Sequence, residues 1–264
     1  MLGKLLIYDF KWVYKLVAIF YVLEFIFSVI GRALSTIENS IVFSILSKTA
    51  YVIAIIMMIG SLINCLMRLF ERFIKNVYKD ESYLTHTLPV EKKTIFASKV
   101  IVGLISIFTT TIVTIVCLFI CFYSKQNIQE LKTMLEFAAT TYDTTVLKFL
   151  LLMLVVIFLE LIYVLLTGYV GIIIGHKTNK NKMSKSILLV LVFYFVFHQL
   201  LSLGLIAILG LLNPDIMSLI NTNDTVNINT IKQVLYAVIC MYIAEIIFFY
   251  ILGQKQLNKG VNVE

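Results

Sequence analysis

The sequence predicts an all-α, polytopic membrane protein with six transmembrane helices. Of its 264 residues, 60% are hydrophobic and only 14% are charged, and the mean hydropathy is +0.97. A soluble domain carries roughly 25% charged residues, and several apolar runs here reach the ~20 residues that a helix needs to cross a bilayer. The chain contains only two prolines and eleven glycines. We therefore expect largely unbroken helices and not a barrel.

Long apolar runs place six spans within a single transmembrane domain that covers residues 1–264. A short amphipathic helix is expected between the third and fourth spans, within residues 124–146. No internal repeat is evident by eye, and a division into two groups of three spans stays open. The approximate spans are 14–34, 49–69, 98–123, 147–175, 186–212 and 233–253.

Lys and Arg residues are distributed unequally between the two sides of these spans. Of the 22, sixteen fall on the side that holds both termini and six fall on the other side. The positive-inside rule places the first side in the cytoplasm. A chain this rich in Lys, Ile and Asn is typical of bacteria, so we expect a multi-pass protein of the bacterial plasma membrane. Topology then explains the net charge of +7, and no nucleic-acid partner is expected.

The first fifteen residues have an amphipathic pattern. Asp9 falls on the apolar side, and the sequence offers no reason for it. The pattern favours an interfacial helix that lies on the inner membrane surface before the first span, although a lysine-anchored end of that span would produce it too. The polar face holds Lys4, Tyr8, Lys11 and Lys15, and the apolar face holds Leu2, Leu6, Phe10 and Val13.

The segment 79–99, KDESYLTHTLPVEKKTIFASK, is a polar interruption between the second and third spans. Ser82 is a candidate cap for a short helix, and Pro89 is expected to end that helix. Two uses of the helix stay open: a docking surface for a partner protein, or an amphipathic connector that lies on lipid headgroups. The residues that share one side of it are Tyr83, Leu84, Thr87 and Leu88.

This segment resembles the loop between the second and third spans in permeases of type-2 ATP-binding-cassette exporters. In that family an acidic stretch runs into Leu-x-x-Pro-Val-Ser, then a basic residue, then Ile or Leu and a terminal Lys. The chain departs from the pattern at Ser82, where Gly is common, at His86, where Leu is usual, and at Glu91, where Ser is common. The matching residues are Glu81, Tyr83-Leu84-Thr85, Leu88-Pro89-Val90, Lys92, Ile95 and Lys99.

The resemblance implies that the short helix is a coupling helix, seated in a cleft of a separate ATPase subunit. It also implies a dimer of permeases, homomeric or heteromeric, that assembles with two ATPase subunits. ATP and Mg²⁺ would then be held by the partner ATPase. The residues that the resemblance assigns to this contact are Glu81, Tyr83, Leu84, Thr87, Leu88, Pro89, Val90 and Lys92.

The sequence lacks the motifs of an ATPase or another enzyme. It contains no phosphate-binding loop of the form G-x-x-x-x-G-K-[ST], and its inner segments are too short for a nucleotide-binding domain. We therefore expect no enzymatic activity, no cofactor and no metal in this chain. The cysteines lack the spacing of a metal site and are interpreted as small buried hydrophobes. They are Cys65, Cys117, Cys121 and Cys240.

Four ionisable side chains lie near the middle of predicted spans: Glu24, Glu160, His198 and Glu245. Such groups cost a few kcal/mol each on insertion scales and usually face the bundle interior or a cavity. No Lys or Arg lies at their depth. The carboxylates must therefore be protonated, hydrated in a cavity, or paired with His198 or one another. Three roles stay open: interhelical assembly, a cavity for a cationic amphipathic substrate, or a proton relay.

With the family resemblance, these features predict the permease subunit of an ATP-driven exporter. An amphipathic or hydrophobic compound, such as an antimicrobial or toxin peptide, is the expected substrate. The alternatives are a proton-coupled carrier and a membrane scaffold or immunity protein without transport.

Overall fold

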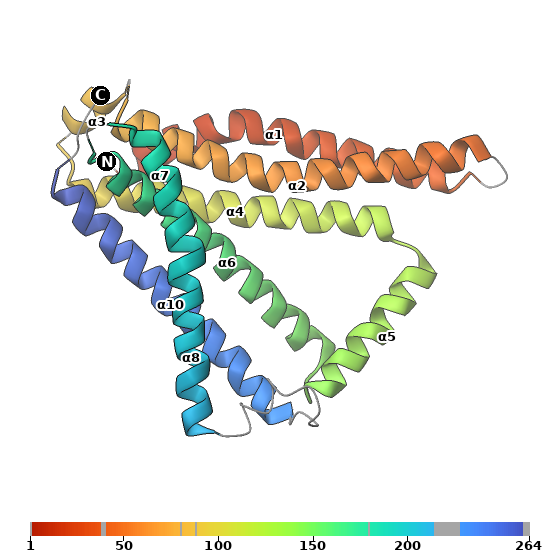
Figure 1. Ribbon diagram of the computed structural model, residues 1–264. Helices are drawn as coiled ribbons and strands as arrows, with labels where there is room; N and C mark the ends of the chain where they lie inside the picture. Colours follow the sequence, from red (N-terminus) through yellow and green to blue (C-terminus); the bar gives the residue numbers. More distant parts are fainter. Residues whose placement is uncertain are drawn as a thin grey trace. The chain divides into compact units, whose positions relative to one another are not determined.

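The computed structural model describes residues 2–37, 41–79, 81–87, 89–178, 180–213 and 228–260. Within these ranges the regular structure is entirely helical (Figure 1). The chain divides into two compact units, unit 1 (Met1–Gln129) and unit 2 (Glu130–Asn262). Each unit holds three of the six helices that are long and apolar enough to cross a membrane. The predicted all-α class and the predicted number of spans are therefore confirmed.

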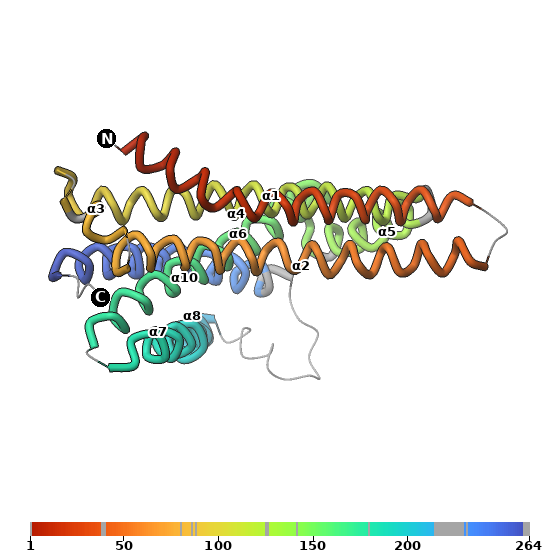
Figure 2. Tube along the Cα trace, turned by 90° about the horizontal axis from the view of Figure 1, so that it is seen from above, coloured from red at the N-terminus to blue at the C-terminus, as the bar shows by residue number. Residues whose placement is uncertain are grey.

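Unit 1 is built on three long helices that lie side by side in both views (Figures 1 and 2). The second of them has 37 residues, which at 1.5 Å per residue is about 55 Å and exceeds the ~30 Å apolar layer of a bilayer. It is therefore long enough to continue beyond the membrane, as its apolar spacing predicts. The elements are α1 (Leu2–Ser35), α2 (Ile41–Val77), α3 (Ser82–Thr87) and α4 (Lys92–Phe122), and α5 (Lys125–Thr141) follows them.

Small and hydroxyl-bearing residues join the helices of unit 1, as is usual where lipid replaces water. The Tyr21 hydroxyl on α1 lies 2.7 Å from the Thr110 hydroxyl on α4. The Ser47 hydroxyl on α2 donates to the carbonyl of Gly31 on α1 at 2.9 Å. A Cβ atom at Gly31 would lie 2.7 Å from the Tyr51 ring, so this position requires glycine for the close approach of α1 and α2.

Unit 2 contains the last three membrane-length helices, and one of them changes its winding. The helix Lys182–Leu212 begins as an α-helix, passes through six residues of π-helix and continues as an α-helix. A π-helix closes its hydrogen bonds over one residue more than an α-helix does and is often found at functional sites. The elements are α6 (Val146–Gly175), α7 (Lys182–Leu191), the π-helix η1 (Val192–Phe197), α8 (His198–Leu212) and α10 (Ile228–Asn258).

The end of α6 lies close to the start of α7. Asn181 precedes α7 with a φ of 54°, in the left-handed region. A Cβ atom at Gly175 would lie 2.6 Å from the backbone nitrogen of Ser186, so the two helices approach each other closely here. The Ser186 hydroxyl lies 3.2 Å from Nδ1 of the buried His176, which fixes the pairing of the two helix ends.

At the N-terminus, Leu2–Ser35 is one continuous α-helix, so a separate interfacial helix before the first span is not shown. The continuity agrees with the other alternative, a lysine-anchored end of that span. Asp9 is only 2% exposed and packs among the helices of unit 1. A helix is present between the third and fourth spans, as α5, and its Leu131 side chain is 56% exposed.

Candidate functional site

The helix α3 presents one face outward and one face inward. Tyr83 and Leu84 are 73% and 71% exposed, whereas Ser82 and Thr85 are buried. Large apolar side chains on the outer face of a six-residue helix make it a candidate contact surface. Of the other residues assigned to ATPase contact, Thr87 and Pro89 are exposed, Val90 and Lys92 are half-buried, and Leu88 lies outside the described residues.

The predicted role of Ser82 as a helix cap is wrong. Ser82 is the first residue of α3, and its buried hydroxyl has no hydrogen-bond partner among the residues that the structure describes. Glu81 occupies the position before the helix, and its carbonyl accepts from the Thr85 amide at 3.0 Å. Its carboxylate is directed to Arg72 on α2 instead of to the first turn.

Glu81 fastens α3 to the end of α2. Both of its carboxylate oxygens accept from one terminal nitrogen of Arg72 at 2.7 Å, and Oε2 also accepts from Asn76 Nδ2 at 3.1 Å. Burial raises the pKa of the Glu81 carboxyl, but the hydrogen bonds from Arg72 and Asn76 and the positive charge of Arg72 outweigh burial. The pKa therefore lies below its ordinary value, and Glu81 is ionised at neutral pH.

The same arginine extends the connection to α1 and α4. Arg72 Nε donates to Asp9 Oδ1 at 2.7 Å, and Lys99 Nζ donates to both oxygens of Asp9 at 2.8 and 2.7 Å. The side chains of Asp9, Arg72 and Lys99 are 3%, 9% and 3% exposed. We call Asp9, Arg72, Asn76, Glu81 and Lys99 the α3 anchor.

The charges of the α3 anchor balance, with two carboxylates and two cations. Buried charges are costly unless they are paired and hydrogen-bonded, and charge-assisted bonds are the stronger ones. Aromatic packing supports the same region: the buried Phe73 ring lies 6.4 Å from both Phe96 and Tyr78, between centroids. This arrangement connects α3 to the three long helices of unit 1.

A groove of about 640 Å³ lies beside α3. Trp12 of α1 forms part of its wall, and the Arg68 guanidinium lies 4.2 Å from the centre of the indole ring, within the range of a cation–π interaction. The groove therefore combines aromatic, aliphatic and charged groups. Its lining residues are Leu5, Tyr8, Lys11, Trp12, Arg72, Asn76, Glu81, Leu84, Thr85 and Thr87.

A second polar group lies inside unit 2, around the π-helix. His198 Nδ1 is 3.1 Å from Glu245 Oε2, so the predicted pairing of a glutamate with His198 is present for Glu245. Tyr194 donates its hydroxyl proton to Glu160 Oε1 at 2.6 Å. We call Glu160, Tyr194, His198 and Glu245 the polar cluster.

Glu24 belongs to unit 1 and has a different environment. Its side chain is fully buried, and one oxygen accepts from the Ser61 hydroxyl at 3.0 Å. The other oxygen has no hydrogen-bond partner among the described residues. Glu24 thus has a neutral partner from α2, which fits interhelical assembly, the first of the three roles that the sequence left open.

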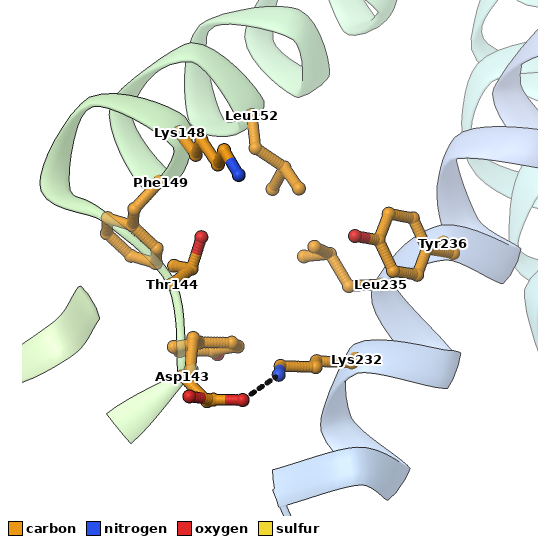
Figure 3. Close-up of a pocket in the computed structure, with 9 residues that line it drawn as sticks. Asp143, Thr144, Lys148, Phe149, Leu152, Lys232, Leu235 and Tyr236 are labelled. Atoms are coloured by element: carbon orange, nitrogen blue, oxygen red, sulfur yellow. Dashed lines mark hydrogen bonds and ion pairs between the residues drawn. The ribbon is translucent and has the colours of Figure 1, made fainter. Parts of the chain in front are cut away.

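Figure 3 shows a further pocket, between the start of α6 and the start of α10. Its volume is about 160 Å³, and its polar contact is the pair between Lys232 Nζ and Asp143 Oδ2 at 3.5 Å. Asp143 is 90% exposed in this pair. An ion pair that is this long and this exposed contributes little, and the pocket is too small for a drug-sized ligand.

Neither site involves residues that could together hold a metal ion. Among the residues that the structure describes, no group of three or more His, Cys, Asp or Glu side chains has the geometry for one. The cysteines of the described residues are free thiols.

Sequence reasoning missed the acidic partner of the α3 anchor and the tyrosine of the polar cluster. Asp9 is separated from Arg72 by 63 residues and from Lys99 by 90. The one available signal was a carboxylate on the apolar face of a helix, which requires a buried cationic partner. Tyr194 gave no comparable signal, because tyrosine is ordinary in a membrane helix.

Comparisons with known proteins identify no relative. No family model, no curated protein and no solved structure matches this chain.

Proposed function

We propose that the chain is the membrane permease subunit of an ATP-driven exporter and that α3 receives a separate ATPase subunit. The proposal is supported by one observation: α3 has an exposed apolar face and is held to α2 at its start. Its outer face exposes Tyr83 and Leu84, while Glu81 at its start is bound to Arg72. A helix with these properties can contact a partner and transmit its movement. The likeness of residues 81–99 to the coupling segment of type-2 exporters agrees with this role.

The α3 anchor supplies a route for that movement. A displacement of α3 pulls on Glu81 and, through Arg72, on the carboxylate of Asp9 in α1. Lys99 connects the same carboxylate to α4. Because charge-assisted hydrogen bonds are short and strong, force applied at α3 would reach all three long helices of unit 1.

The composition of the outer face favours a protein partner over lipid headgroups. Interface cores are enriched in aromatic residues and depleted of charge, and a polar rim surrounds them. Tyr83 and Leu84 provide the apolar centre, and an acidic and a basic residue, Glu91 and Lys93, are exposed nearby in the sequence. Exposed groups of both signs suit a protein interface, whereas the polar face of a helix that lies on headgroups is rich in Lys and Arg.

The assembly and substrate follow from the same proposal. Two permease chains would enclose a path for an amphipathic or hydrophobic substrate, and two ATPase subunits would bind the ATP and Mg²⁺. The termini would lie in the cytoplasm of a bacterial cell, on the same side as α3.

Affinity purification of the full chain from native membranes in mild detergent tests the proposal. We expect a nucleotide-binding chain to copurify with the wild type. Tyr83→Ala/Leu84→Ala should reduce its yield at least about tenfold, since central interface residues contribute about 2 kcal/mol or more. Leu131→Ala, which truncates an exposed leucine on α5, is the matched control and should leave the yield unchanged.

Two results would contradict the proposal. Absence of any nucleotide-binding chain from the wild-type preparation would favour the proton-coupled carrier or the scaffold, neither of which needs an ATPase. An unchanged yield with the double variant would show that the ATPase binds elsewhere and that α3 is a connector.

A further inference from the structure

We propose that Glu160, His198 and Glu245 form a proton-binding site inside unit 2, in which Tyr194 of the π-helix holds Glu160. The ligand is the proton itself, and the site does not depend on ATPase docking at α3. The inference rests on the contacts of these side chains, on their burial and on their charge count.

The site is assembled from four helical elements. Glu160 comes from α6, Tyr194 from η1, His198 from the first residue of α8 and Glu245 from α10. The bonds are Tyr194 to Glu160 at 2.6 Å and His198 to Glu245 at 3.1 Å. Residues more than thirty positions apart in sequence are thus brought into hydrogen-bond contact within the apolar part of the chain.

Tyr194 and His198 are four residues apart and therefore lie on one side of the helix Lys182–Leu212, where Tyr194 contacts Glu160 of α6 and His198 contacts Glu245 of α10. Within the π-helix, the carbonyl of Phe193 accepts the Tyr163 hydroxyl at 2.7 Å. The Tyr163 ring in turn lies 5.9 Å from the ring of Tyr194 and 5.3 Å from that of His198, so it packs between the two halves of the site.

The charge count favours bound protons. Among the residues that the structure describes, no Lys or Arg forms an ion pair with Glu160 or Glu245. Glu245 is fully excluded from the surface of the chain. An uncompensated carboxylate is costly at such a depth, and two carboxyls with one imidazole are neutral when they share two protons. The other titratable groups that face them are the phenols of Tyr163, Tyr194 and Tyr242, which stay neutral near pH 7.

His198 is more accessible than its partner Glu245. Its side chain is 24% exposed, whereas that of Glu245 is 0% exposed; Glu160, in the other pair, is half-buried. When Nδ1 carries the proton, it donates toward Glu245 Oε2. A proton that binds to Nε2, followed by transfer of the Nδ1 proton to the carboxylate, leaves a neutral imidazole in its other tautomer and a protonated carboxyl. The pair can therefore pass one proton inward with no net change in the charge of the histidine, whose tautomer changes.

Infrared difference spectroscopy of the purified full chain in lipid nanodiscs tests this site. The signal is the carbonyl stretch of protonated carboxyl groups, recorded between about pH 9 and pH 6, a range in which ordinary carboxyls stay ionised. We expect a protonated-carboxyl band in the wild type and the loss of one to two carboxyl equivalents in Glu160→Gln/Glu245→Gln. Glu24 contributes equally to both samples and cancels in the difference spectrum.

Two further variants complete the test. Glu136→Gln changes a carboxylate on α5 whose side chain is 49% exposed and should leave the band unchanged. His198→Gln retains both carboxyls but removes the cationic partner of Glu245, so the band should persist to higher pH than in the wild type. This single variant also serves if the double variant does not fold.

The proposal is overturned if the spectra of the wild type and the double variant superimpose throughout the pH range. It is equally overturned if His198→Gln folds and titrates as the wild type does, since the histidine would then have no part in proton binding.

Discussion

Asp9 in unit 1 and Glu245 in unit 2 are both buried carboxylates on apolar helices, yet their partners differ. Asp9 contacts a guanidinium and an ammonium group at 2.7 Å. Glu245 contacts an imidazole at 3.1 Å. Arg is permanently charged, whereas an imidazole gains and loses its proton near neutral pH. The partner therefore decides whether a buried carboxylate is a fixed structural ion or an exchangeable proton site.

The strongest test of this difference is to neutralise Asp9. Asp9→Asn removes the carboxylate that the buried Lys99 ammonium contacts and one of two acidic partners of Arg72. Breaking a buried ion pair on one side costs about 3–5 kcal/mol. We expect a loss of that size in the free energy of unfolding, measured by circular dichroism in mixed micelles of lipid and denaturing detergent.

Two variants serve as controls for Asp9→Asn. Asp143→Asn changes an exposed aspartate and should alter stability by about 0.5 kcal/mol or less. Adding Lys99→Met to Asp9→Asn removes the buried ammonium group and should recover part of the lost free energy of unfolding. A loss below about 1 kcal/mol for Asp9→Asn alone would mean that Asp9 is not a structural ion.

The same chemical change at Glu245 should have a smaller effect. Glu245→Gln preserves shape and a hydrogen bond to His198, and no permanently charged group is left unpaired. We expect a loss of about 1 kcal/mol, the typical net value of one hydrogen bond, in the same unfolding experiment. A loss as large as that of Asp9→Asn would remove the distinction between the two regions.

The smallest expected effect concerns pH and Glu81. Its pKa is lowered in the folded state, so the Arg72–Glu81 bond stabilises the protein above the ordinary carboxyl pKa of 4.5. This stabilisation disappears as the pH falls through the lower pKa of the folded state. The Glu81 side chain is 40% exposed, so solvent screening limits the effect to about 0.5 kcal/mol.

Glu81→Gln isolates this contribution. The variant should be less stable than the wild type at neutral pH, and the difference should vanish once the pH falls below the lowered pKa of the folded-state Glu81 carboxyl. A difference that persists at lower pH would have to arise from packing and not from the carboxylate charge.

The number and order of the spans could be predicted from the sequence because each is a long apolar run bounded by charge. The extent of each helix could not. The second span is predicted to begin near residue 49, yet α2 begins at Ile41. An apolar run shows which part of a helix can contact lipid. The helix itself ends at its last backbone hydrogen bond, which can lie outside the apolar run. The sequence likewise left open whether residues 1–15 form an interfacial helix or the end of the first span, and it offered no reason for Asp9, because the partners of Asp9 lie far along the chain.

The candidate sites were predictable in part. The short helix before Pro89 and its exposed residues Tyr83 and Leu84 follow from local spacing, and the structure confirms that the helix exists. The pairing of Glu245 with His198 was one of several alternatives, because two spans can face each other in more than one rotation. The π-helix had no sequence signal, since Val192–Phe197 has the composition of an ordinary span.

Trp12 gives unit 1 a natural optical reporter. It is the chain's one tryptophan, it is half-buried, and it shares a groove with Leu84 of α3. Light that excites indole selectively therefore samples this one location. A protein that covers α3 would displace water from the groove and change the colour and intensity of the emission, so its binding could be followed in the unlabelled wild-type chain.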